Sequence, residues 1–171
     1  RTYLQKKSLA NVKVRINDYC PGDEFSRVAK NRAVGAPWRF TLGMLSAVYY
    51  TIMPGRFFGG DNYNPYSNNI NIYSDHPAIL LHEAGHSKDF AQRTWKGTYS
   101  FMYNLPFFAL YPEALATGDA IGYLRAERDT AVEKGGYKVL YPAYATYLAG
   151  ADNGYIPMEE WVRYALQAAF V

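Results

Sequence analysis

The sequence has a single cysteine, Cys20, so the fold cannot depend on a disulfide within the chain. Neither sign of charge predominates: 18 lysine and arginine residues are nearly balanced by 15 aspartate and glutamate residues, which leaves a net charge of +3. The basic residues are scattered among acidic ones and form no stripe. These features argue against nucleic acid as a partner, and they leave the cellular compartment undetermined.

Long hydrophobic runs are missing as well. The longest, residues 40–53, is shorter than the roughly 18–20 apolar residues that a membrane-spanning helix needs. We therefore expect a buried core helix there. Membrane association through residues 40–53 or 101–112 is an alternative that the sequence does not specifically indicate. A chain of 171 residues fits one domain, residues 1–171, which can bury a core without cross-links.

Tyrosine, in contrast, is abundant, with 17 residues. Its ring and hydroxyl suit half-buried positions, interfaces and polar clefts, and the composition does not select among these. Apolar residues make up 49% of the chain and charged residues 19%, which is typical of an ordered globular protein.

Two stretches alternate apolar and polar residues and are predicted to be strands. Residues 10–17 place Val12, Val14 and Ile16 on one side. Residues 69–73 alternate isoleucine with asparagine, which predicts a strand with one solvated face at the edge of a sheet. The turn-forming residues 59–69 between them leave no room for a regular element.

The remaining patterns predict helices. We expect them at residues 20–31, 38–53, 77–93, 142–149 and 157–170, with a further long helix that begins near Pro112. Residues 132–138 are expected to be a loop. The order of elements predicts an α+β fold with a small N-terminal mixed sheet and a mainly helical C-terminal half.

The three histidines, His76, His82 and His86, all lie within SDHPAILLHEAGH. Pro77 suits the first turn of a helix, and His82 and His86 are then one turn apart on one face. Each imidazole can direct one nitrogen at a single zinc ion. Glu83 projects about 100° further round the helix, where it can accept a proton from a zinc-bound water. His76 lies outside this face and is expected to be a capping or surface residue.

A catalytic zinc usually has three protein ligands and an open fourth position. No third histidine lies downstream and Cys20 stands alone, so the third ligand must be a carboxylate. Glu113 is the leading candidate, because it lies in an otherwise apolar run where an unpaired carboxylate would be costly to bury. Asp89 shares the histidines' face but lies too far along the axis for direct ligation, and it is expected to support a histidine instead. Asp119 is a second candidate for that supporting role.

Interpretations without a metal compete with this one. HExxH can arise by chance on an exposed helix face, and Glu113 can be an exposed first-turn residue stabilised by the helix dipole. The apolar residues 79–81 argue instead for a buried helix. Ala84 and Gly85 are small and let another element approach closely.

With HEAGH on one helix and Glu113 on the next, residues 69–124 resemble the zincin metallopeptidases, and their gluzincin branch in particular. In size the chain is similar to the compact minigluzincins. The metzincin branch is a poor match, since Asp89 and Gln92 stand where that branch has a glycine and a third histidine. Gluzincins often have an aspartate four residues after the ligand glutamate, and this sequence has Thr117 there. The resemblance implies a zincin-like fold with an edge strand beside the active-site helix.

The resemblance also implies zinc-dependent hydrolysis of peptide bonds, with one Zn²⁺ ion and Glu83 as general base. The substrate would be a peptide or protein extended along residues 69–73. A tyrosine is expected to stabilise the oxyanion, and four tyrosines remain candidates: Tyr103, Tyr111, Tyr144 and Tyr147. The alternative is a non-catalytic or latent zincin-like domain that acts as an accessory or interaction subunit.

Overall fold

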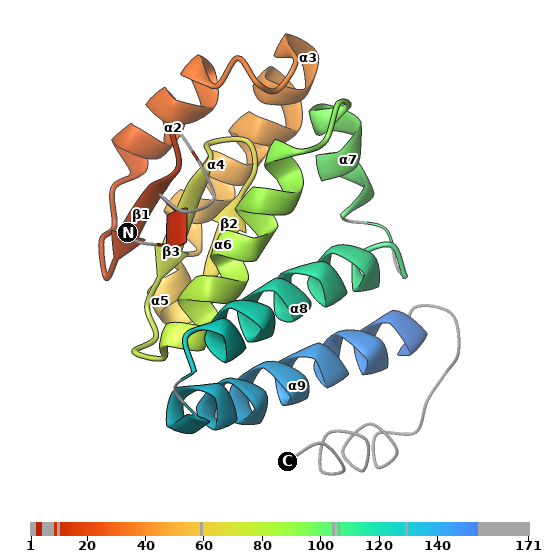
Figure 1. Ribbon diagram of the computed structural model, residues 1–171. Coiled ribbons are helices and arrows are strands. Elements are labelled where there is room, and N and C mark those ends of the chain that lie inside the picture. Colours follow the sequence, from red (N-terminus) through yellow and green to blue (C-terminus); the bar gives the residue numbers. More distant parts are fainter. Residues whose placement is uncertain are drawn as a thin grey trace.

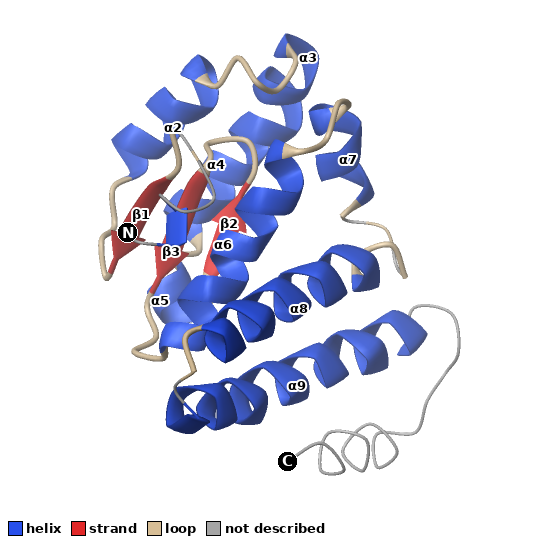
Figure 2. Cartoon of the chain, in the orientation of Figure 1, coloured by secondary structure: helices blue, strands red, loops and turns tan. Residues whose placement is uncertain are grey.

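The computed structural model describes residues 3–4, 9, 11–58, 60–103, 105, 107–128 and 130–153. A small three-stranded sheet is combined with a mostly helical remainder, so the fold is α+β, as predicted (Figures 1 and 2). The elements are β1 (Lys13–Ile16), α2 (Pro21–Lys30), α3 (Ala36–Trp38), the π-helical turn η1 (Arg39–Gly43), α4 (Met44–Ile52), α5 (Gly55–Phe58), β2 (Asn62–Asn64), β3 (Asn69–Ile72), α6 (Pro77–Ala91), α7 (Lys96–Met102), α8 (Leu110–Ala126) and α9 (Thr130–Asn153).

The sheet is mixed and has the order β1-β3-β2. Strand β1 is parallel to β3, with Val14 opposite Ile70, and β2 is antiparallel to β3, with Tyr63 opposite Ile70. The predicted edge position of residues 69–73 is therefore wrong, because β3 is the central strand and all four of its residues are buried.

The prediction that residues 59–69 contain no regular element is also wrong, since β2 lies within them. Side chains form hydrogen bonds with backbone groups of the turn that joins β2 to β3. The backbone N–H of Tyr66 donates to the side-chain oxygen of Asn64, and the amide of Asn31 donates to the carbonyls of Pro65 and Tyr66. Asparagine here stabilises a hairpin, whereas its low strand propensity predicts only a loop.

The two faces of the sheet differ in chemistry. Ile70 and Ile72 pack against Ala84 on one face, which α6 covers. On β1 the predicted alternation is only partly right: Val12 and Val14 pack against the cluster that contains these residues, but Ile16 is 62% exposed and Arg15 is 2% exposed. The guanidinium of Arg15 is buried because two carboxylates of α2, Asp23 and Glu24, bind it.

Helices α6, α8 and α9 pack against one another, and Figure 1 shows α8 and α9 side by side beyond α6. The loop predicted at 132–138 is wrong, because α9 continues through it. Gly136 is a close-packing position rather than a break, since a Cβ atom there would lie 2.6 Å from Leu124. The helix predicted at 142–149 is part of α9, and that predicted at 157–170 lies outside the described residues.

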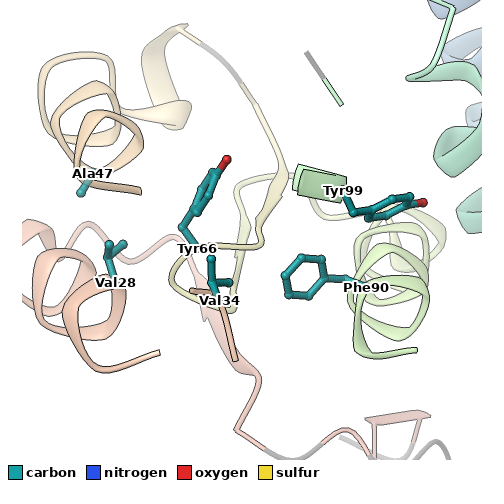
Figure 3. Packing of buried hydrophobic residues seen from close by; sticks show 6 residues of the cluster. All are labelled: Val28, Val34, Ala47, Tyr66, Phe90 and Tyr99. Carbon is teal, nitrogen blue, oxygen red and sulfur yellow. The ribbon is translucent and has the colours of Figure 1, made fainter. Parts of the chain in front are cut away.

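A hydrophobic cluster connects α2, α4, α6 and α7 (Figure 3), and it consists of Val28, Val34, Ala47, Tyr66, Phe90 and Tyr99. The expectation of a buried core helix at residues 38–53 is only half right. Ala47 and Tyr50 are buried, but Leu45 and Ile52 are 63% and 67% exposed. Among the helices that the structure describes, none has the length and apolar character needed to cross a bilayer.

Candidate metal centre

Helix α6 places His82 and His86 one turn apart, and their Nε2 atoms lie 3.0 Å from each other. The helix begins after His76, whose Nδ1 atom accepts a hydrogen bond from the backbone N–H of Ala78. The predicted capping role of His76 is thus confirmed. Two histidines four residues apart face the same way because a helix repeats every 3.6 residues.

Glu113 lies in the first turns of α8 and brings its carboxylate to both imidazoles. Its Oε2 atom is 3.0 Å from Nε2 of His82, and its Oε1 atom is 3.3 Å from Nε2 of His86. These separations approach the edge of a ligand tetrahedron, about 3.3 Å when each ligand is 2.0–2.1 Å from a zinc ion. Among the described residues, the donor set His82, His86 and Glu113 fits a divalent cation.

Burial and hydrogen bonding oppose each other at Glu113, which is 5% exposed. Burial raises the pKa of its carboxyl group, but hydrogen bonds from His82 and His86 outweigh burial and lower the pKa to about 2. The carboxylate is therefore ionised at neutral pH, as metal ligation requires.

The second nitrogen of each imidazole, Nδ1, lies within hydrogen-bond distance of a hydroxyl group. Nδ1 of His86 lies 3.1 Å from the hydroxyl of Tyr103, and Nδ1 of His82 lies 3.3 Å from Oγ1 of Thr117. When Nε2 binds a cation, Nδ1 carries the proton, so both hydroxyls act as acceptors that hold the ring orientation.

The predicted supporting roles of Asp89 and Asp119 are wrong. The carboxylate of Asp89 binds Arg93 and the hydroxyl of Tyr99, and that of Asp119 binds Lys88 and the hydroxyl of Tyr3. Neither carboxylate has a hydrogen bond to a histidine in the described part of the chain. The carboxylate of Asp89 pairs instead with Arg93, which lies just beyond the end of α6.

Glu83 is buried between α6 and the sheet, with 8% exposure. Burial raises the pKa of its carboxyl group to about 7, and the nearby Glu113 and Asp61 carboxylates act in the same direction. His82 and the backbone N–H of Tyr63, in β2, partly offset this. A carboxyl group with a pKa near neutrality, beside a candidate metal centre, is suited to accept and return a proton.

A cavity of about 300 Å³ lies along β2 and reaches α7. Its lining includes Asn62 and Asn64 of β2, Tyr50 of α4, Ser100 of α7 and Tyr103 just after α7. None of the described lining residues is charged. The hydroxyl of Tyr66, also in the lining, is buried and has no hydrogen-bond partner among the described residues. The cavity therefore offers uncharged polar groups, and Tyr103, which contacts His86, is the lining residue that connects it to the histidines.

The four tyrosines predicted as candidates to stabilise the oxyanion have different surroundings. Tyr103 is committed to His86, and the hydroxyl of Tyr111 lies 3.5 Å from a guanidinium nitrogen of Arg93. Tyr144 is half-buried on α9, and the side chain of Tyr147 lies outside the described residues. No sequence pattern indicates the contact of Tyr103 with His86, because it joins α6 to the residue that follows α7.

Comparison with protein-family models, with curated proteins and with solved structures gives no match.

Proposed function

We propose that this chain is a zinc-dependent metallopeptidase of the gluzincin type, with His82, His86 and Glu113 as metal ligands and Glu83 as general base. The observation that carries the proposal is the convergence of three donor groups from two helices, within 4.8 Å of one another, beside a buried fourth residue that can transfer a proton. Two histidines four apart are a local feature, but the arrival of Glu113 from another helix is not.

Both hydrogen bonds and a bound cation fit the separation of the two imidazoles. Without a metal, one imidazole can carry its proton on Nε2 and the other can accept there, so the 3.0 Å between the two nitrogens is a normal hydrogen-bond distance. A cation among the three groups would instead give each of them a favourable contact and remove the cost of burying a carboxylate.

When bound, zinc supplies a Lewis acid that polarises the scissile carbonyl and lowers the pKa of water. The chain's own residues then orient and transfer protons. His82 and His86 keep a fixed orientation because Thr117 and Tyr103 contact their Nδ1 atoms. Glu83 accepts the proton of the attacking water and returns it to the amine that leaves.

The substrate in this proposal is a peptide in extended conformation that adds to β2 rather than to residues 69–73. Strand β3 has partners on both sides, whereas β2 is an edge strand of the described sheet and contacts α6. The backbone of Tyr63, in β2, contacts Glu83, so a peptide paired with this edge would lie beside the general base. The uncharged cavity along β2 would accept side chains of such a peptide.

Metal content of the purified full chain tests the ligand set. Wild-type protein is expected to contain one zinc per chain, and Glu113→Ala is expected to lose it. Asp119→Ala is the matched control, because it removes a carboxylate of the same helix that binds Lys88 rather than a histidine. Equal zinc content in the Glu113→Ala and Asp119→Ala proteins would exclude Glu113 as a ligand.

Peptide hydrolysis tests the catalytic role. Glu83→Gln preserves the size of the side chain and is expected to bind zinc but cleave no peptide. If this variant cleaves peptides as fast as the wild type, Glu83 is not the base.

A non-catalytic zincin-like domain is the second candidate. Exposed aromatic side chains support it, among them Trp95 with 77% exposure and Tyr111 with 51%, because such residues are enriched at protein interfaces. Zinc-loaded wild-type protein that cleaves no member of a broad peptide library would favour this function.

A further inference from the structure

Helix α4 presents an apolar face to solvent. Leu45, Val48, Tyr49 and Ile52 are 63%, 39%, 57% and 67% exposed. Their spacing of three and four residues places them on one side of the helix, opposite the buried Ala47. Single exposed apolar residues are ordinary, but an apolar stripe along one helix indicates a surface that binds a partner.

The segment of sequence that contains α4 has basic residues but no acidic ones. No aspartate or glutamate occurs between Glu24 and Asp61. Two cations of that interval adjoin α4 along the chain: Arg39 in η1, which leads into α4, and the exposed Arg56 in α5, which follows it. Figure 1 shows α3 at one end of α4 and α5, which contains Arg56, at the other. Positive charge is thus present toward both ends of the apolar stripe.

The guanidinium of Arg39 is close to this surface as well, because it lies over the ring of Phe40 with 5.2 Å between Cζ and the ring centre. Phe40 is 57% exposed. An aromatic ring, apolar side chains and cations on one exposed surface are the combination by which a helix lies in the headgroup region of a membrane.

We propose that the exposed face of α4, consisting of Phe40, Leu45, Val48, Tyr49 and Ile52, docks on a membrane surface that contains anionic lipid. The partner is lipid because the surface combines apolar burial with positive charge that an anionic headgroup layer neutralises. The helix lies on the membrane and does not cross it, since α4 has only 9 residues and no described helix is both long and apolar enough to span a bilayer. This docking does not depend on the proposed hydrolysis.

Cosedimentation of the full chain with vesicles tests the proposal. Vesicles of phosphatidylcholine with added phosphatidylserine are expected to pellet the wild-type protein, and vesicles of phosphatidylcholine alone to pellet much less of it. Ile52→Asp and Leu45→Asp are expected to lower the partition coefficient by about ten-fold or more, because each places a charge in the docked face. Arg56→Gln is expected to weaken binding to the anionic vesicles only.

Ile16→Asp is the matched control. Ile16 is 62% exposed, close to the 67% of Ile52, and it lies on β1, so the same substitution leaves the α4 face unchanged. This variant is expected to bind vesicles like the wild type, and circular dichroism confirms that each variant is folded.

The proposal is overturned if wild-type protein stays in the supernatant with both kinds of vesicle, or if Ile52→Asp pellets as the wild type does. Light scattering identifies the competing occupant. Self-association that Ile52→Asp abolishes, in a wild type that binds no vesicles, would assign the face to a second copy of the chain and refute lipid docking.

Discussion

A Cβ atom on residue 85 would lie 2.9 Å from the Cα atom of Ala116, so the absence of a side chain at Gly85 lets α8 pack directly against α6. The contact joins the turn of α6 that contains both histidines to the part of α8 that contains Glu113. The distance of 3.0 Å between Glu113 and His82 therefore depends on a position that is not itself a ligand.

The first prediction concerns this contact. Gly85→Ala is expected to force the helices apart, because the new methyl group meets backbone atoms that cannot move independently. Overpacking should lower the free energy of unfolding by about 1–3 kcal/mol and zinc affinity on the order of 10-fold. Urea unfolding and a competitive chelator titration measure the two effects.

Gly118→Ala is the control for that substitution. A Cβ atom on residue 118 would have no heavy atom of the described residues within 4 Å beyond its own helix backbone. Helix α8 is therefore expected to gain about 0.5–1 kcal/mol of stability from the alanine, with unchanged zinc affinity. Equal effects of the two alanines on zinc affinity would contradict the role of Gly85.

The second prediction concerns the hydroxyl of Tyr103, which lies 3.1 Å from Nδ1 of His86. Tyr103→Phe keeps the ring and removes the group that fixes the imidazole, so zinc affinity is expected to fall about 10–100-fold. Tyr141→Phe, at a position 45% exposed on α9, should leave the affinity unchanged. Wild-type affinity in the Tyr103→Phe protein would show that the contact does not support ligation.

The third prediction concerns pH and the metal-free protein. Glu83 has a folded-state pKa of about 7, raised mainly by burial from the ordinary 4.5. Between these values the folded state keeps a proton that the unfolded state has released, so the stability contributed by protonated Glu83 is lost as pH rises to 7. Glu83→Gln removes this loss. Its stability relative to wild type should therefore increase from pH 4.5 to pH 7, by at most about 3 kcal/mol.

Asp23→Asn provides a control whose effect is expected to stay constant over the same pH range, because the pKa of Asp23 is shifted in the opposite direction. Hydrogen bonds from Lys13 and Arg15 lower the pKa of Asp23 to about 2, so this stabilisation is present throughout pH 4.5–7 and is lost only in stronger acid. Urea unfolding at several pH values should show a constant deficit for Asp23→Asn. A constant difference for Glu83→Gln as well would mean that the pKa of Glu83 is not raised.

The fourth prediction concerns the buried ion pair of Arg15 and Glu24, whose side chains are both fully buried with 2.5 Å between Nη1 and Oε2. Arg15→Met leaves a buried carboxylate that only the amides of Asn64 and Asn69 still contact, which should cost about 3–5 kcal/mol. The double variant Arg15→Met/Glu24→Leu should be more stable than Arg15→Met alone. Additive losses in a double-mutant cycle would contradict this coupling.

Local patterns predicted the helices around the site with useful accuracy. The helix predicted at 77–93 is α6, residues 77–91, and the helix predicted to begin near Pro112 begins at Leu110. Both depend on residues close in sequence, such as Pro77 in the first turn and the apolar run beyond Glu113. Patterns of this kind did not predict α9 across 132–138, because glycine signals a loop unless a neighbouring helix requires its small size.

The sheet was predicted less well, because burial of a strand depends on what covers it. The alternating pattern predicts that Arg15 is solvated, yet the carboxylates of Asp23 and Glu24 in α2 make its burial favourable. Asn69 and Asn71 read as the wet face of an edge strand, but β1 and β2 flank β3 on both sides. These partners are distant in sequence, so no local period contains them.

The sequence alone determined that His82 and His86 face the same direction, because the helical repeat of 3.6 residues follows from backbone geometry. It also limited a third protein ligand to a carboxylate, since the chain has no other suitable histidine or cysteine pair. Only the tertiary structure decided that Glu113 reaches both imidazoles, that Tyr103 rather than Asp89 contacts His86, and that α4 turns an apolar face outward. These outcomes depend on how closely whole helices pack, which close contacts such as that of Gly85 with Ala116 determine.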